Sequence, residues 1–318
     1  MADSWDCVVV GGGAAGLSAA LVLGRARRRT LVIDDGDQSN LAAAGIGGLL
    51  GHDGRPPAQL YAMGRRELAA YPSVEVRGGT VRGGMRTDSG FVLDLGDGAS
   101  VRTRRVLLAT GMQYRPPELP GLAELWGRSV FHCPFCHGWE VRDQPLAVLG
   151  DGGRAVHQAL LLRNWSDDIV VLTNGPAGFT AADRARLAAA AVVIDERPVA
   201  ELAADDGDLI AIVFGGGERL PRRGMLVATT LHQRSPLADD LGARHGDATP
   251  LAADPIEVDA FMRTTAVGVF AAGDVSTVMP QVASAIAAGS LAATAVVQSL
   301  ASDDYGLVGP EWRSHVNA

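Results

Sequence analysis

Two cysteines separated by two residues, Cys133 and Cys136, lie near the middle of the chain. Such a pair can close into a disulfide or open into two thiols, and neighbouring dipoles and bases set its reactivity. Pro134 predicts a helix with Cys133 as its N-cap, because proline at the first helical position loses no needed hydrogen bond. A helix N-terminus also lowers a thiol pKa. The pair is therefore predicted to be a redox-active disulfide.

Two other interpretations of this pair remain open. Half of a zinc site is disfavoured because the third cysteine, Cys7, is far away in sequence and no second pair exists, so no metal is expected. An inert buried pair is disfavoured by the neighbouring Pro134, His137 and Gly138, which are unusual choices for a plain core.

A glycine-rich turn near the N-terminus predicts a dinucleotide site. The apolar run 5–10 predicts a buried parallel strand, residues 11–16 read Gly-Gly-Gly-Ala-Ala-Gly, and a helix and a second strand follow. The glycines permit the tight turn and let the helix N-terminus approach a pyrophosphate. The second strand ends in Asp34, 18 residues after Gly16, which is the candidate partner of the adenosine ribose hydroxyls, with Asp35 as the alternative.

A second strand–turn–helix–strand unit follows the cysteines. Residues 150–155 read Gly-Asp-Gly-Gly-Arg-Ala after a strand, and the next strand, 169–172, ends in Thr173-Asn174-Gly175. This end carries no acid for a ribose diol and no arginine pair for a 2′-phosphate. Arg184 and Arg186 come later and are predicted to lie on an exposed helix face. The second unit is therefore built like a nucleotide site but lacks its specificity chemistry.

Between the two strand–turn–helix–strand units, and again after the second one, the sequence predicts strands and linkers. Residues 74–106 alternate apolar and polar residues with Gly and Asp turns, which predicts an antiparallel meander. A strand and the turn Ala109-Thr110-Gly111 end this section. Residues 112–121 and 233–236 are predicted to be linkers.

Near the C-terminus, a strand leads into Gly273-Asp274, and Gln281 and Val282 open a long alanine-rich helix. A carboxylate at such a strand end can bind a polyol, with helix N–H groups facing an electron-rich ring. The helix is long enough to cross a membrane, but its alanine content and scattered polar residues predict a buried helix instead.

The composition limits the class of protein. A chain of 318 residues suggests about two domains, and 47% hydrophobic residues with 40 glycines fit a compact α/β protein. A net charge of -8 argues against nucleic acid or an anionic membrane as a partner. Three cysteines exclude a disulfide framework and fit a reducing cytoplasm, and the first residues do not have the basic start of a signal peptide.

Together these motifs resemble the low-molecular-weight thioredoxin reductase family of flavoproteins, over nearly the whole chain. The resemblance implies an α/β fold with two Rossmann-like dinucleotide-binding domains, FAD as the cofactor, and a homodimer. Residues 1–114 and 241–318 would form a discontinuous FAD domain. Residues 115–240 would form an inserted pyridine-nucleotide-type domain that carries the cysteines. The implied FAD-binding residues are Gly11, Gly13, Ala14, Ala15, Gly16, Asp34, Asp35, Ala109, Thr110, Gly111, Gly273, Asp274, Gln281 and Val282.

Three departures from the family pattern are informative. Thr173-Asn174-Gly175 stands where NADPH-dependent members carry a His-Arg-Arg pattern, and His137 replaces the acid after the second cysteine. Pro280-Gln281 replaces an Arg-Gln pair near the flavin pyrimidine. The sequence Cys-Pro-Phe-Cys-His-Gly, with His52-Asp53-Gly54, resembles the dithiol oxidases that close disulfides in natural products such as gliotoxin and holomycin.

The favoured hypothesis is a dithiol oxidase that acts on a small-molecule dithiol, with O2 as the acceptor and H2O2 as the product. By the resemblance, Cys133 exchanges with the substrate and Cys136 lies against the flavin. His137 would take a thiol proton near neutral pH, or else bind only a backbone group. His52 and His132 are expected to be structural.

Two alternatives are a disulfide reductase driven by NADPH or another donor, and a non-catalytic flavin redox sensor. The missing arginines disfavour NADPH, and the chain has no effector module. The aromatic residues Phe135, Trp126 and Trp139 line a substrate pocket in one interpretation and form core or dimer contacts in another.

Overall fold

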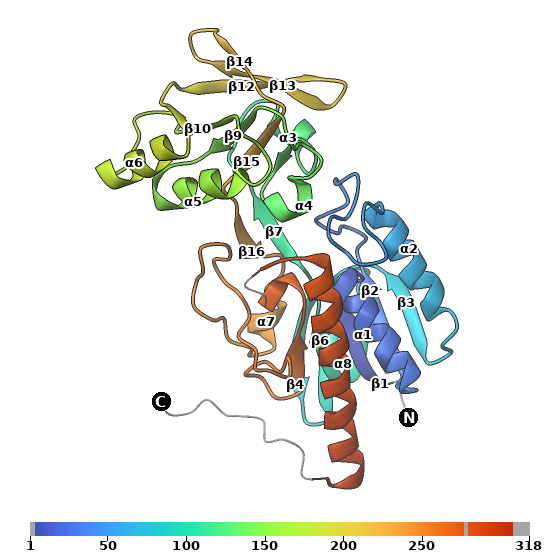
Figure 1. Cartoon of the computed structure of the whole chain (residues 1–318). Helices are drawn as coiled ribbons and strands as arrows, with labels where there is room; N and C mark the ends of the chain where they lie inside the picture. The colour runs from blue at the N-terminus through green and yellow to red at the C-terminus, as the bar shows by residue number, and fades with distance from the viewer. Residues whose placement is uncertain (1–3, 277–278, 308–318) are drawn as a thin grey trace. The chain divides into compact units, whose positions relative to one another are not determined.

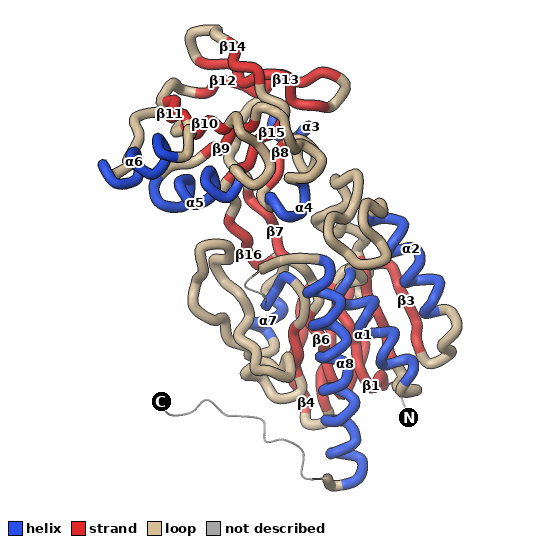
Figure 2. The backbone as a smooth tube through the Cα atoms, viewed as in Figure 1, coloured by secondary structure: helices blue, strands red, loops and turns tan. Residues whose placement is uncertain are grey.

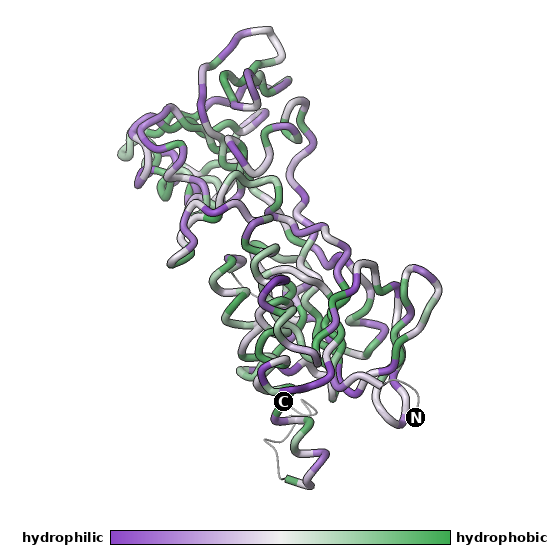
Figure 3. The backbone as a smooth tube through the Cα atoms, turned by 90° about the vertical axis from the view of Figure 1, so that its right-hand side faces the viewer, coloured by the Kyte–Doolittle hydropathy of each residue, from purple (hydrophilic) through white to green (hydrophobic). Residues whose placement is uncertain are grey.

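The chain divides into two compact units in the computed structural model, which describes residues 4–276 and 279–307 (Figure 1). Each unit has its own hydrophobic interior, and hydrophilic residues follow its surface loops (Figure 3). Unit 1 comprises Met1–Leu41, Pro57–Tyr114 and Thr230–Ala318, and unit 2 comprises Ala42–Pro56 and Arg115–Thr229.

These units differ from the expected segments in two places. Residues 42–56 belong to unit 2, because a Cβ on Gly47 would lie 2.7 Å from the Cys136 carbonyl oxygen, so this loop packs tightly on the redox motif. Residues 230–240 belong to unit 1, where they contribute a strand and a short helix.

Unit 1 is built on a seven-stranded sheet in the order β3-β2-β1-β6-β5-β4, with β17 also paired to β6. The strands β1, β2, β3, β6 and β17 pair in parallel, whereas β4, β5 and β6 pair antiparallel. Their bounds are β1 Ser4–Val10, β2 Thr30–Asp34, β3 Val74–Gly78, β4 Val81–Thr87, β5 Gly90–Leu95, β6 Ser100–Leu108 and β17 Val269–Ala271.

The predicted antiparallel meander over 74–106 is wrong for its first strand. Helix α2 (Pro57–Leu68) connects β2 to β3, and a crossover of this kind returns the chain in the same direction, so β3 pairs with β2 in parallel. The antiparallel part is restricted to β4, β5 and β6.

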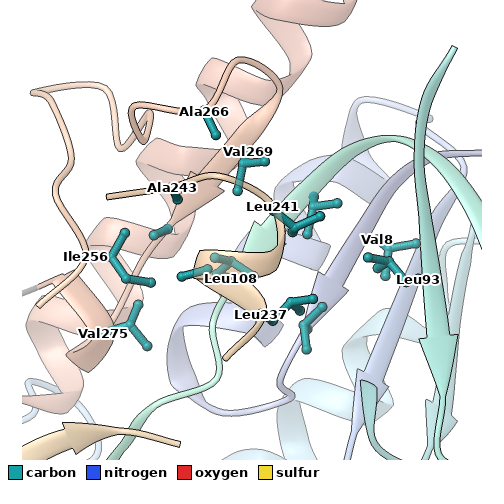
Figure 4. Packing of buried hydrophobic residues seen from close by; sticks show 14 of the residues in the cluster. Val8, Leu93, Leu108, Leu237, Leu241, Ala243, Ile256, Ala266, Val269 and Val275 are labelled. Carbon is teal, nitrogen blue, oxygen red and sulfur yellow. The ribbon is translucent and has the colours of Figure 1, made fainter. Parts of the chain in front are cut away.

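Alternate residues of β1 face two separate cores, as the period of two in a strand requires. Cys7 and Val9 pack with helices α1 (Ala14–Arg25) and α8 (Val282–Tyr305). Val8 and Val10 pack on the other face with residues of β5 and of the short helix α7 (Leu237–Asp240). Figure 4 shows this second core, where residues from distant parts of the chain meet.

Helices α1 and α8 approach each other so closely that a side chain at the crossing is excluded. A Cβ on Gly289 would lie 2.0 Å from the Ala15 carbonyl oxygen, and the Ser18 hydroxyl donates to the Ile286 carbonyl over 2.8 Å. Among the described residues, α8 is the one helix long and apolar enough to cross a membrane. One face of α8 packs on unit 1, so the predicted buried helix is half correct.

Unit 2 is built on a five-stranded parallel sheet in the order β11-β10-β9-β15-β8. Helices α5 and α6 pack on one face, and the antiparallel strands β12, β13 and β14 with α3 pack on the other (Figure 2). Bounds in this unit are α3 Leu122–Leu125, β8 Val130–Phe131, α4 Pro134–His137, β9 Leu146–Leu149, α5 Gly152–Leu162, β10 Ile169–Leu172, α6 Ala181–Ala189, β11 Val193–Asp195, β12 Val199–Asp205, β13 Asp208–Phe214, β14 Arg219–Pro221 and β15 Gly224–Val227.

The first segment predicted to be a linker, 112–121, begins with a strand, whereas the second, 233–236, overlaps a strand only at Gln233. β7 (Met112–Arg115) and β16 (Thr230–Gln233) pair with each other as a separate two-stranded sheet. Met112 and Leu231 are fully or almost fully buried in the core of unit 1, so both strands are anchored in that unit. A four-residue strand gives too short a pattern to be recognised in the sequence.

Candidate active site

Cys133 and Cys136 form a disulfide at the start of the one-turn helix α4, with their Cα atoms 5.3 Å apart. Cys133 is the N-cap in an extended conformation and Pro134 occupies the first helical turn, so the predicted helix start is confirmed. The preceding strand, β8, places Cys133 at the carboxyl edge of the parallel sheet. Both cysteines are half-buried, which leaves the disulfide partly open to a small molecule.

His137 is held in one tautomer by its surroundings. Its Nε2 lies 3.1 Å from the Gly127 carbonyl oxygen, which can only accept, so Nε2 carries the proton. Nδ1 is then the basic nitrogen; it is buried and has no hydrogen-bond partner of normal geometry among the described residues. Phe131 stacks on the ring at 5.5 Å.

The pKa of His137 is lowered below its ordinary 6.5, mainly by burial. The backbone carbonyls of Gly127 and Cys133 and the charge of Glu140 oppose this change in part. The imidazole is therefore neutral at pH 7, with an unprotonated Nδ1 beside the redox helix. This is the form that a general base requires.

A pocket of about 390 Å³ opens beside Cys136 and His137. Val141 and Leu209 give it apolar walls, and other lining residues lie just before β8, β9 and β15 in the chain, namely Ser129, Gln144 and Arg223. Its charged lining residues are Arg128, Glu140, Asp208 and Arg223.

The three aromatic residues near the cysteines have different environments. Phe135 and Trp139 are 55% and 66% exposed, and Phe135 meets Trp165 edge to face. Trp126 packs against the core of unit 2 and stacks on His132 at 5.7 Å. Burial lowers the pKa of His132 to about 4, so this histidine is neutral and part of the packing.

The other histidine and cysteine named above lie in structural positions. His52 Nδ1 accepts a hydrogen bond from Arg55 Nε over 2.9 Å inside the loop 42–56. Cys7 is a free, fully buried thiol in β1, and burial raises its pKa to about 12, which makes it unreactive. Among the described residues there is no cluster of three or more His, Cys, Asp and Glu side chains that could hold a metal.

The first glycine turn forms a cradle with Asp34 at the end of β2. Oδ1 of Asp34 accepts from Gly12 N at 3.0 Å and from Gln38 Nε2 at 2.9 Å, and Oδ2 lies 3.5 Å from the guanidinium of Arg65. A Cβ on Gly12 would lie 2.5 Å from this carboxylate, so only glycine fits. Asp35 is exposed and binds the backbone N–H of Asp37, away from the turn.

The rest of the predicted cofactor site gathers at the same edge of the unit 1 sheet. Gly11 has a φ of +107°, and a Cβ there would lie 2.2 Å from the Ala109 carbonyl oxygen, so the two turns touch. Gly13 is the N-cap of α1, with Ala14, Ala15 and Gly16 in its first turn, and Thr110 and Gly111 follow Ala109.

Asp274 approaches the same place from β17. Gly273 has a φ of +87° beside Ala15, and Asp274 accepts a hydrogen bond from the Tyr114 hydroxyl over 3.0 Å. Burial raises the pKa of Asp274, and the Tyr114 hydrogen bond opposes this. Gln281 is the N-cap of α8, and Val282 is its first residue. The starts of α1 and α8 each have a glycine turn and a carboxylate nearby, and this arrangement fits a bound dinucleotide.

The roles of three residues in these sites were not predicted from the sequence. Gln38 and Tyr114 orient Asp34 and Asp274, and the Gly127 carbonyl sets the tautomer of His137. Each lies in a segment without periodicity, and its role depends on a partner placed by the fold. A tyrosine three residues beyond the Ala-Thr-Gly turn was the only available signal.

The family model for pyridine nucleotide-disulphide oxidoreductases matches residues 5–289. Thioredoxin reductase aclD of Aspergillus oryzae is 31% identical over 314 residues, covering 95% of this chain and 98% of that protein. Thioredoxin reductase tcpT of Claviceps purpurea is 30% identical, with 94% and 95% covered.

Solved structures give a similar result. The crystal structure of HlmI is 37% identical with a TM-score of 0.90, covering 96% of this chain and 95% of that chain. An oxidoreductase from Agrobacterium tumefaciens is 33% identical with a TM-score of 0.87, covering 94% and 99%.

Proposed function

Because the chain belongs to the pyridine nucleotide-disulphide oxidoreductase family, we propose that it is a dithiol oxidase of that family. The predicted resemblance to thioredoxin reductases, the two-domain α/β fold and the FAD cofactor are confirmed by the similarities above. The chain is thus a thioredoxin reductase-like disulfide oxidoreductase. The proposal adds the direction of the thiol–disulfide reaction: a small dithiol is oxidised, and O2 accepts the electrons.

The single observation that carries this direction is the state of His137. Oxidation of a dithiol needs a base, because a thiolate and not a thiol attacks a disulfide. His137 directly follows Cys136 in the sequence and supplies an unprotonated Nδ1; the Gly127 carbonyl fixes this tautomer, and burial favours the neutral ring.

The reaction then proceeds at the disulfide. A substrate thiol loses its proton to His137, and the thiolate attacks Sγ of Cys133; the Cys133–Cys136 bond breaks and its electron pair remains on Cys136. The second substrate thiol loses its proton to solvent, and the resulting thiolate attacks its partner sulfur in the mixed disulfide, which releases the substrate disulfide and the Cys133 thiolate. FAD held by unit 1 would supply the acceptor for the two electrons of the reduced cysteine pair, with O2 as the final acceptor. The sum is one dithiol and one O2 converted to one disulfide and one H2O2.

The structure favours a small substrate. A pocket of about 390 Å³ beside Cys136 and His137 is in the size range of sites for small molecules. Arginine and carboxylate side chains at its edge suit a molecule that carries amide or other polar groups beside its two thiols. The exposed Phe135 and Trp139 add apolar surface near the pair.

The proposal also covers the roles of the two units, the oligomeric state and the location. Residues 1–41, 57–114 and 230–318 would bind FAD, and unit 2 would carry the redox chemistry. We propose a homodimer because the resemblance to the family implies one. In addition, Leu291 on α8 is 40% exposed, which leaves an apolar side chain at the surface. A cytoplasmic location is proposed from the small number of cysteines.

Oxygen consumption tests this function. FAD-loaded protein supplied with dithiothreitol in air should consume one O2 and release one H2O2 per disulfide formed. Cys133→Ser should abolish this consumption. Turnover that requires NADPH, with thioredoxin or a disulfide as the oxidant, would contradict the proposal and identify a reductase.

A further inference from the structure

The glycine turn of unit 2 carries an acidic residue at a position where unit 1 has glycine. Gly12 is the second residue of the first glycine motif, 11–16, and Asp151 is the second residue of the second motif, 150–155. Asp151 is the N-cap of α5, but its carboxylate does not cap that helix. Instead both of its oxygens accept from the backbone N–H of Gly178, at 3.0 and 2.9 Å.

This contact reverses the arrangement found in unit 1. There the carboxylate stands at the end of the second strand, on Asp34, and the turn donates through Gly12 N. In unit 2 the carboxylate stands on the turn, and the donor, Gly178, lies in the segment that follows β10. The carboxylate of unit 1 stands where a ribose diol would bind, whereas the carboxylate of unit 2 stands where a pyrophosphate would bind.

The segment after β10 is held down at further points. Thr173 Oγ1 donates to the Gly175 carbonyl over 2.6 Å, and Asn174 Oδ1 accepts from Val199 N over 2.8 Å. The nearby arginines are engaged with acids: Arg184 lies 2.9 Å from Glu196 and Arg197 lies 2.6 Å from Asp195. A dinucleotide that crossed this edge would have to separate Gly178 from Asp151.

We propose that Asp151 excludes pyridine nucleotides from unit 2, by closing the route with Gly178 and by placing a negative charge at the start of α5. This deepens the proposed function and rests on it, since electrons then come from the dithiol alone. Two like charges a few ångströms apart near a protein surface reduce affinity by roughly tenfold to a hundredfold.

Binding by calorimetry to the FAD-loaded protein tests the proposal. NADPH and NADH are the probes, and the variants are Asp151→Gly, which restores the unit 1 sequence, and Asp151→Asn, which removes the charge but keeps an acceptor for Gly178. Asp167→Gly is the control, because Asp167 is an exposed acid at the opposite edge of the same sheet, 97% exposed in its side chain. Thermal unfolding checks that each variant is folded.

Asp151→Gly is expected to bind both nucleotides at least tenfold more tightly than the wild type, and Asp151→Asn to gain less. The two nucleotides should bind equally, because residues 173–175 carry neither an acid nor an arginine. Wild-type binding as tight as that of Asp151→Gly, or an equal gain in Asp167→Gly, would overturn the proposal. Dithiol-dependent O2 consumption by the wild type, measured separately, shows whether the proposed function itself fails.

Discussion

At the scale of single residues, the chemistry depends on contacts that fix a proton or a carboxylate. Nε2 of His137 donates to the Gly127 carbonyl, so Nδ1 is the nitrogen that can accept a proton. Oδ1 of Asp34 accepts from Gly12 and Gln38, and Oδ2 lies 3.5 Å from Arg65. In both cases a backbone contact orients the side chain.

Replacement of His137 by alanine should slow disulfide reduction by the substrate about a hundredfold at pH 7, because a general base contributes roughly 10²–10⁴-fold. Burial lowers the pKa of His137, so the wild-type base stays unprotonated at pH 6.5 and is lost only at lower pH. The deficit of the variant should shrink as the pH rises towards about 8.5, where substrate thiols ionise without help. Stopped-flow measurement of FAD reduction by dithiothreitol across this pH range gives the result.

His52→Ala is the matched control, because His52 lies in the same unit and its side chain accepts a hydrogen bond from Arg55 within the loop 42–56. It should change the rate by less than a few-fold. An unchanged rate in a folded, FAD-loaded His137→Ala protein would show that His137 is structural.

The two cysteines should behave differently when each is replaced by serine. With Cys133 as the attacked sulfur, Cys136→Ser should trap the substrate as a mixed disulfide on Cys133, whereas Cys133→Ser should trap none. Intact-protein mass spectrometry after addition of a small dithiol in its oxidised form distinguishes the two. A stable adduct on Cys136 alone would reverse the assignment.

At the scale of elements, the sequence predicted those helices, strands and turns that depend on residues close together in the chain. Pro134 marked the start of α4, and the strand, glycine turn and helix of 5–20 were correct because their signals are contiguous. The direction of β3 and the strands β7 and β16 were not predicted, because they are four or five residues long and are fixed by partners far away in sequence. The contact of Asp151 with Gly178 spans 27 residues and has no local pattern.

The crossing of α1 and α8 gives a prediction about stability. Gly289→Ala should destabilise unit 1 by about 1–3 kcal/mol, because the new Cβ would lie 2.0 Å from the backbone oxygen of Ala15 and force the helices apart. The same crossing holds the first turn of α1, so the variant should also bind FAD more weakly. Thermal unfolding and FAD release measure the two effects.

Gly78→Ala is the control in the same unit, since nothing lies within 4 Å of a Cβ there. It should change the unfolding temperature little. Equal stability of Gly289→Ala and the wild type would mean that α8 can move away from α1 at low cost.

At the scale of the whole molecule, the sequence predicted the α/β class and the two dinucleotide-type units, because each contains a strand, a glycine turn and a helix in order. It did not predict that residues 42–56 belong with the redox helix. That loop has little hydrophobic pattern, and its place depends on the close approach of Gly47 to Cys136.

Unit 1 and unit 2 share one architecture but differ in what their edges can bind. In unit 1 the glycine turn donates to Asp34 at the end of β2, whereas the turn of unit 2 is tied through Asp151 to the segment that follows β10. Under the proposed function, the electrons enter through the disulfide and not through a nucleotide.

The most direct test of this account is the source of those electrons. FAD-loaded protein is mixed under anaerobic conditions with stoichiometric dithiothreitol, NADPH or NADH, and the flavin absorbance is followed. Dithiothreitol should bleach the flavin within seconds and neither nucleotide should do so, and admission of air should restore the absorbance with release of H2O2. Rapid bleaching by NADPH, with no bleaching by the dithiol, would contradict the account.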